Sequence, residues 1–149
     1  MNFDGNFKFN APREKVWKFF MNPDMLAKCL PGCKKLEEKG ENSYEATVKI
    51  GISVVKGEYS GKVELKDIVA PSHYRLVGEG GGLSGFVKGE VTMDFEEESD
   101  KTIVKWKSDA QIGGLIAGVG QRMLSGVAKI LTNQFFKDME KEMTKEESL

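Results

Sequence analysis

Residues 54–97 decide the fold: VVKGEYSGKVELKDIVAPSHYRLVGEGGGLSGFVKGEVTMDFEE. Apolar and polar residues alternate along most of this stretch, as expected for β-strands with one buried face. Turn residues interrupt the alternation at Ala70-Pro71-Ser72 and again between Gly80 and Gly85. The stretch is therefore predicted to form three strands, at 54–67, 73–80 and 85–97. Short turns between successive strands indicate an antiparallel meander.

The flanking sequence extends this meander and supplies the helices. Alternating segments predict four further strands, at 2–9, 33–39, 43–50 and 101–111. Asn10-Ala11-Pro12 and Asn22-Pro23 each begin a short helix, because proline suits the first helical turn. A helical period from about Gly113 to about Met143 predicts one long C-terminal helix. Its apolar stripe is expected to begin with Val119, Met123, Val127 and Ile130.

The predicted fold is α+β, with residues 1–149 forming a single domain. An antiparallel sheet with one polar face must bury the other, and the long helix is the largest cover available. We expect a strongly curved seven-stranded antiparallel sheet wrapped around that helix, with the two short helices after the first strand.

Glycines on the inward face of the sheet predict a hollow. Six of them, on three neighbouring strands, stand where bulky core residues would normally lie: Gly57, Gly61, Gly78, Gly80, Gly85 and Gly89. An underfilled apolar space is a binding site by default. The alternative interpretation is that these glycines only let the sheet bend. If they do leave space, Gly89→Leu should fill it while the protein stays folded.

The side chains expected around this hollow are apolar or aromatic. They are Tyr59, Val63, Tyr74, Leu76, Val91, Met93, Trp106, Val119, Met123 and Val127. The glycine-rich ends of strand and helix are expected to form a mobile rim or gate: Gly80, Gly82, Leu83, Gly113 and Gly114.

Catalysis, cofactors and metals find little support in the sequence. The inward residues include no charged side chain, so a general acid or base is missing from the expected cavity. The single histidine, His73, lies at a turn, and Cys29 and Cys33 lack a nearby histidine for a zinc site. The run Gly80–Gly85 satisfies G-x-G-x-x-G, but a strand pattern follows it instead of the required helix. We expect no cofactor, no metal site and no catalytic residue.

Charge and hydropathy limit the partners. A net charge of -1 gives no field suited to nucleic acid. The sequence shows no signal peptide and no bilayer-spanning run, which predicts a cytoplasmic protein. Residues 11–35 carry an excess of lysine and arginine that could favour peripheral contact with an anionic membrane, or simply be solvated. Gly114 and Gly118 offer a smooth helix surface to a protein partner.

Several motifs resemble those of the carbon monoxide dehydrogenase G-subunit family. They are Leu30-Pro31-Gly32-Cys33, Ile50-Gly51, Lys56-Gly57, Ser60-Gly61, Gly113-Gly114, Gly120 and Phe135-Phe136. That family belongs to the START-like and pollen-allergen-like helix-grip superfamily (SRPBCC), and the resemblance covers about residues 2–140.

This resemblance implies a helix-grip fold with an apolar cavity and no catalysis of its own. It further implies an accessory role beside a molybdenum hydroxylase of the aerobic carbon monoxide dehydrogenase type, handling a lipid-like or quinone-like molecule. Two alternatives remain: a helix-grip enzyme such as a cyclase or hydrolase acting on a hydrophobic substrate, and a pure protein-interaction module.

Overall fold

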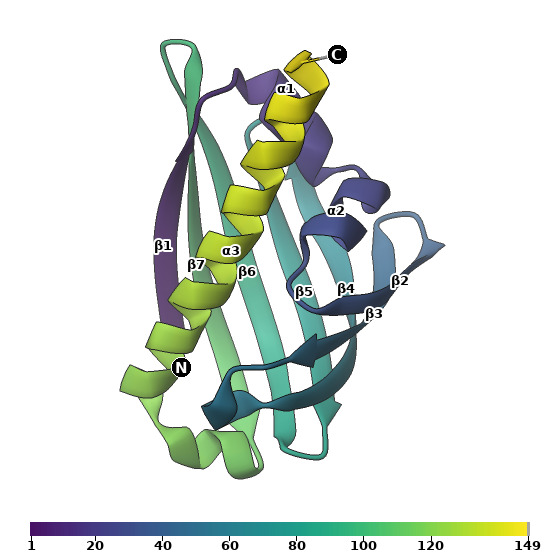
Figure 1. The fold of residues 1–149 in the computed structure, drawn as a ribbon, viewed down its shortest axis with the longest axis vertical. Helices are drawn as coiled ribbons and strands as arrows, with labels where there is room; N and C mark the ends of the chain where they lie inside the picture. Colours follow the sequence, from purple (N-terminus) through teal and green to yellow (C-terminus); the bar gives the residue numbers. More distant parts are fainter. Residues whose placement is uncertain (149) are drawn as a thin grey trace.

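The computed structural model describes the chain through Ser148, and its side chains through Lys145. Seven antiparallel strands form one sheet in the order β1-β7-β6-β5-β4-β3-β2 (Figure 1). The strands are β1 (Asn2–Phe9), β2 (Cys33–Gly40), β3 (Ser43–Ile50), β4 (Gly57–Val69), β5 (His73–Gly82), β6 (Gly85–Glu98) and β7 (Lys101–Gly113). The predicted helix-grip architecture is confirmed.

Three α-helices and two short 3-10 helices complete the part of the chain that the structure describes. They are α1 (Arg13–Phe20), α2 (Pro23–Cys29), η1 (Ser53–Val55), η2 (Leu115–Val119) and α3 (Gln121–Ser148). The Asn22 side chain caps α2 by accepting a hydrogen bond from the Asp24 backbone N–H at 2.9 Å. Figure 1 shows α3 crossing the concave side of the sheet, with α1 and α2 near its C-terminal end.

The long helix begins later than its sequence period suggests. Residues 113–120 were expected to form its first turns, but Gly114 and Gly120 have φ angles of 79° and 92°. Such angles are incompatible with a right-handed helix and are readily adopted only by glycine. The chain therefore makes only the short helix η2 between these two glycines, and α3 starts at Gln121.

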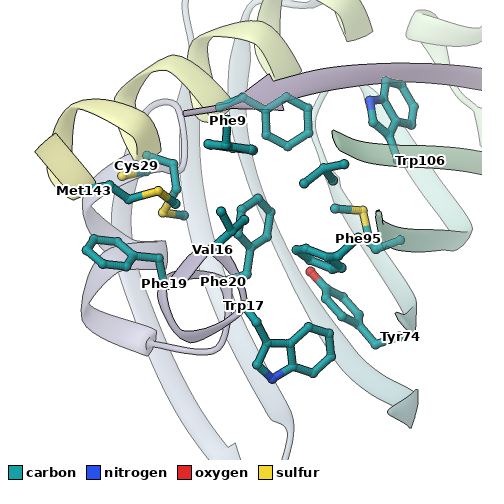
Figure 2. Packing of buried hydrophobic residues seen from close by; sticks show 14 of the residues in the cluster. Phe9, Val16, Trp17, Phe19, Phe20, Cys29, Tyr74, Phe95, Trp106 and Met143 are labelled. Atoms are coloured by element: carbon teal, nitrogen blue, oxygen red, sulfur yellow. The ribbon is translucent and has the colours of Figure 1, made fainter. Parts of the chain in front are cut away.

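Aromatic residues fill the core at the end of the sheet covered by α1 and α2 (Figure 2). The rings of Trp17 and Phe20 meet Phe95 nearly edge-on, with centroids 5.2 and 5.1 Å apart. From α3, Phe136, Met139 and Met143 are buried in the same cluster. A second, smaller cluster at the other end joins Val55 and Ile116 to Leu124 and Val127 of α3.

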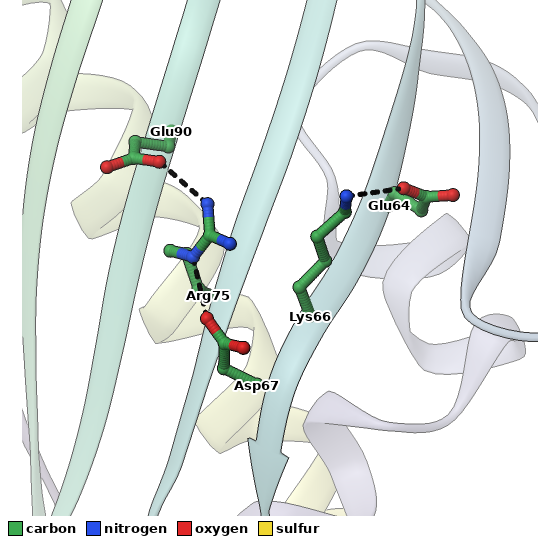
Figure 3. A network of polar contacts seen from close by, with 5 residues as sticks. All are labelled: Glu64, Lys66, Asp67, Arg75 and Glu90. Atoms are coloured by element: carbon green, nitrogen blue, oxygen red, sulfur yellow. Dashed lines mark hydrogen bonds and ion pairs between the residues drawn. The ribbon is translucent and has the colours of Figure 1, made fainter.

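Charged side chains cover the outer face of the sheet. Arg75 on β5 reaches Asp67 and Glu90 on its two neighbouring strands, each at 2.8 Å (Figure 3). This pairing lowers the pKa of Asp67 through the hydrogen bond and charge of Arg75. Because these groups are exposed, they contribute little to stability. They do show which face is polar, and hence that the opposite, concave face carries any apolar site.

Candidate functional site

An apolar hollow of about 300 Å³ lies on the concave face between β3 and β7. The residues whose inward positions in the strands face the hollow are mostly small or aliphatic. They are Tyr44, Ala46, Val48, Tyr59, Gly61, Val63, Leu76, Gly78, Gly80, Val87, Gly89, Val91, Ser108 and Ala110. Several of these apolar side chains remain half-buried, Val63, Leu76 and Val91 among them. The concave face is therefore incompletely filled here.

Small residues on adjacent strands produce the hollow. Gly61 lies opposite Gly80, and Gly78 lies opposite Gly89, which in turn faces Ala110. A Cβ atom at Gly61 would lie 2.8 Å from the Cα of Gly80, and one at Gly89 would lie 2.8 Å from the Cα of Ala110. The backbones thus approach too closely for side chains. This close approach agrees with glycines that let the sheet bend, and the hollow lies beside four of the six, since Gly57 and Gly85 do not line it.

The hollow lies to one side of α3. The helix packs against β1, α1 and α2, and no α3 residue lines the hollow. Val63, Leu76 and Val91 border the aromatic cluster, whereas Tyr59 borders the smaller cluster. The hollow therefore lies where the two clusters meet, with β3 and β4 as its far wall.

Five residues predicted for the cavity or its rim line the hollow: Tyr59, Val63, Leu76, Val91 and Gly80. Tyr74, Met93 and Trp106 instead belong to the solid core. Tyr74 packs against Trp17, with ring centroids 5.8 Å apart. The Trp106 ring covers Gly5, where a Cβ atom would lie 2.8 Å from the indole nitrogen. Tyr74 is thus packed against the Trp17 ring, and Trp106 fills the space that Gly5 leaves open. Neither side chain leaves a cavity around it.

The helix residues predicted for the cavity lie elsewhere. Val119 is in η2, and Val127 is buried in the smaller cluster. Met123 is 54% exposed, so its assignment to the cavity is wrong. The late start of α3 explains this error, because the expected stripe was extended from residues that are not helical.

The residues predicted for the rim lie at the end of the molecule that holds the smaller cluster. Gly82 ends β5, Leu83 is in the two-residue turn that follows, and Gly113 and Gly114 connect β7 to η2. Gly80, the other predicted rim residue, lies within β5. The backbone N–H of Ile116 donates to the carbonyl of Ser84 at 2.9 Å, so turn and η2 are tied together. Their mobility as a gate stays a prediction.

Strand β3 contributes wall residues that the sequence argument did not assign to the site: Tyr44, Ala46 and Val48. Their alternation was visible in the sequence, so a signal existed. β3 contains no glycine, so the inward-glycine pattern does not point to it. Val87, Ser108 and Ala110 also line the hollow, from inward positions of β6 and β7.

The chemistry of the hollow is that of a neutral apolar surface. Lys62, Glu79 and Glu90 also border it, but their places in the strand alternation put these side chains on the outer face. The Tyr59 hydroxyl donates to the Val55 carbonyl at 2.6 Å, and burial raises the pKa of Tyr44. Tyr44 therefore stays neutral near physiological pH. This arrangement suits binding by shape and lacks an obvious acid or base for catalysis.

Two larger depressions, of about 770 and 760 Å³, lie on the outer face of the sheet. Lysine and glutamate side chains line both of them, with ion pairs such as Lys62–Glu79 at 3.6 Å. Solvated charges of this kind belong to the twisted outer surface. The smaller concave hollow is the better candidate for an apolar ligand.

The remaining candidate groups are placed as follows. His73 lies at the start of β5, with Nδ1 2.8 Å from an Asp94 carboxylate oxygen. Cys29 is buried and Cys33 half-buried, and both are free thiols. Within the described part of the chain, no cluster of histidine, cysteine and carboxylate side chains suits a metal ion. No helix there combines the length and apolarity needed to cross a bilayer.

Comparisons with known proteins agree with this architecture. A conserved protein from Geobacillus kaustophilus has a solved structure that is 42% identical, with a TM-score of 0.94 over 97% of this chain and 96% of that chain. A START superfamily protein from Mycobacterium smegmatis is 10% identical, with a TM-score of 0.72 over 97% of each chain. The second likeness shows the fold alone. No curated protein matches the chain significantly.

The sequence profile of CoxG, described as the G subunit of carbon monoxide dehydrogenase, matches residues 5–144, nearly the whole chain. The fold of this chain is START-like, as the motifs suggested. This chain is therefore a member of the carbon monoxide dehydrogenase CoxG family.

Proposed function

We propose that this protein binds a neutral, apolar small molecule in the hollow between β3 and β7. The observation that carries the proposal is an unfilled space on the concave face, walled by half-buried aliphatic side chains. Protein interiors are normally close-packed, so such a space needs an explanation. A bound ligand supplies one, because it would cover Val63, Leu76 and Val91 in the way that core side chains cover their neighbours.

The size and chemistry of the hollow narrow the ligand class. Its volume, about 300 Å³, suits one ring system or part of an alkyl chain. Burial of a few hundred Å² of apolar surface, at roughly 25 cal/mol per Å², supports micromolar binding after association costs. The Ser108 hydroxyl can orient one polar group. These features favour a lipid-like or quinone-like molecule, with its remaining length extending out of the hollow.

The role is that of a carrier in the cytoplasm and not of an enzyme. A general acid or base must stand within hydrogen-bond reach of the reacting atom. The inward side chains of the hollow that can hydrogen-bond to a ligand carry hydroxyl groups, such as that of Ser108. Binding and release of an unchanged molecule need no such group, so the chemistry of the hollow favours delivery over catalysis.

The family supports a proposal for the protein partner. Because the family is described as a subunit of carbon monoxide dehydrogenase, we place this protein beside a molybdenum hydroxylase of that type. A tagged copy purified from its native cells should then retain an enzyme that oxidises carbon monoxide and contains molybdenum. Recovery of the protein without any molybdenum enzyme would contradict this part of the proposal.

Native mass spectrometry tests the ligand directly. The protein is incubated with a short-chain naphthoquinone or with a long-chain fatty alcohol, and the spectrum is recorded under non-denaturing conditions. We expect a one-to-one adduct that saturates with concentration. Adducts that grow in number without saturation would show non-specific adsorption and would contradict a defined site.

A further inference from the structure

Three connecting segments gather at the end of the molecule opposite α1. They are residues 51–57 around η1, residues 82–86 around the β5–β6 turn, and residues 113–123 around η2 and the start of α3 (lower end of Figure 1). The Ser84 hydroxyl donates to the carbonyl of Lys56 at 3.4 Å, and the Ser84 carbonyl accepts from Ile116 at 2.9 Å. Ser84 thus links all three segments into one surface, called the apolar tip below.

Large apolar side chains project from the apolar tip into solvent. Leu83 is fully exposed, Leu115 is 80% exposed and Val54 is 37% exposed. Phe86 and Met123 are also exposed. Single exposed apolar residues are ordinary on protein surfaces, but several on three linked segments mark an interaction site.

The charges of the apolar tip have one sign. None of the three segments contains aspartate or glutamate, although the chain carries 23 of them. The segments include two cations, Lys56 and Arg122, and both side chains are exposed. Among the described residues, neither has a carboxylate within ion-pair distance. An apolar surface bordered by unpaired cations is complementary to an anionic one.

The other end of the molecule has the opposite character. Glu96, Glu97 and Glu98 end strand β6, Asp100 follows in the β6–β7 turn, and the last turns of α3 carry both glutamate and lysine. Two basic residues of segment 11–35 form ion pairs there, Arg13–Glu97 and Lys28–Glu142 at 3.8 and 3.5 Å, while Lys34 and Lys35 pair with Glu58 and Glu37 elsewhere on the sheet. Part of the cationic excess expected for residues 11–35 is therefore offset by ion pairs. The two ends together would orient the molecule with its apolar tip toward negative charge.

We propose that the apolar tip docks the protein on an anionic lipid surface. Leu83 and Leu115 enter the boundary between headgroups and acyl chains, while Lys56 and Arg122 contact lipid phosphates. A second copy fits this surface poorly, because a symmetric contact would bring the unpaired cations of both copies together. The proposal rests on exposure and charge at the tip and is independent of any ligand in the hollow.

Vesicle co-sedimentation tests the proposal with two kinds of tip variant. The probes are vesicles of phosphatidylcholine mixed with phosphatidylglycerol, and vesicles of phosphatidylcholine alone. Leu83→Ser with Leu115→Ser removes the inserting side chains, and Lys56→Glu with Arg122→Glu reverses the charge. The matched control is Val69→Ser, an exposed apolar residue at the β4–β5 turn near the acidic end. Circular dichroism checks that all variants are folded.

The wild type and Val69→Ser should bind the anionic vesicles equally and the neutral vesicles much more weakly. Each lost cation should weaken binding about fivefold, and the charge dependence should fade as salt rises. The leucine variant should lose about tenfold or more, because exposed apolar surface no longer leaves water.

Failure of the wild type to bind anionic vesicles overturns the proposal, as does equal loss in Val69→Ser and the tip variants. A wild-type dimer that the leucine variant converts to a monomer would identify a second copy as the occupant and would also overturn it. Vesicle binding can fail while ligand binding in the hollow persists, so the two proposals are tested separately.

Discussion

Gly89 shows how single residues shape both the sheet and its hollow. The sequence alone predicted that leucine at this position would fill the hollow without unfolding the protein. The structure corrects this, because even a Cβ atom would lie 2.8 Å from the Cα of Ala110 and closer still to the Asp109 carbonyl oxygen. The glycine allows two backbones to approach, so any side chain must push the strands apart.

Gly89→Ala should therefore destabilise the protein by roughly 1–3 kcal/mol, as overpacking does. The matched control is Gly126→Ala in α3, where a Cβ atom would meet no neighbour within 4 Å. That change should stabilise the protein by about 0.5–1 kcal/mol, since alanine favours a helix. Urea denaturation measures both free energies of unfolding. Equal and small effects would mean that β6 and β7 can relax around a side chain.

The two cysteines should differ sharply in reactivity. Cys29 is buried under α3, and its burial together with nearby carboxylates raises its pKa to about 11. The thiolate is the reactive form, so Cys29 stays unreactive until the pH approaches that value. In the native protein a thiol reagent at pH 8 should modify Cys33 first and Cys29 only on unfolding. Mass spectrometry of the labelled peptides checks this, and rapid labelling of Cys29 would contradict its burial.

At the scale of elements, the orientation of α3 follows from which of its side chains are buried. Met139 is fully buried, whereas Ile130 is 55% exposed, although Ile130 was expected on the apolar stripe. Met139→Ala should cost about 2–5 kcal/mol of the free energy of unfolding, as large-to-small core changes do. Ile130→Ala should change it by no more than about 0.5 kcal/mol. Thermal or urea unfolding measures the pair, and the reverse ranking would refute the helix register.

The strands could be predicted from the sequence, but the start of the long helix could not. Alternation fixes the faces of β4 to β7 because the side-chain period of a strand is two. In residues 113–120 the apolar spacing also fits a helix. The positive φ angles of Gly114 and Gly120 break that helix. Glycine tolerates many conformations, so its presence alone did not reveal which one these positions adopt.

Only part of the site could be predicted, because alternation gives the direction of a side chain but not its packing partners. Inward positions such as Val63, Leu76 and Val91 follow from alternation. Which inward side chains fill the core depends on what faces them across the sheet and from the helices. Trp106 lies over Gly5, and Tyr74 packs against Trp17 of α1, so neither side chain lines the hollow. Contacts between distant segments of this kind cannot be read from one strand at a time.

At the scale of the whole molecule, the fold has two apolar clusters with the hollow between them. The aromatic cluster lies toward the end with the β6–β7 turn, and the smaller cluster includes Val55 and Ile116 of the apolar tip. The central claim is that the hollow on the concave face binds an apolar ligand. Two valines on opposite faces of the sheet allow this claim to be separated from binding on the outer surface. Val91 lines the hollow, and Val77 lines an outer depression.

The most direct measurement is the melting temperature of the wild type, Val91→Phe and Val77→Phe as a short-chain naphthoquinone or a long-chain fatty alcohol is added. Ligand at about 100 times its Kd should raise the melting temperature by roughly 5–10 °C. The account predicts a saturable rise in the wild type and in Val77→Phe, and none in Val91→Phe, whose added ring occupies the hollow. A rise that survives in Val91→Phe and disappears in Val77→Phe would place the ligand on the outer face and contradict the account.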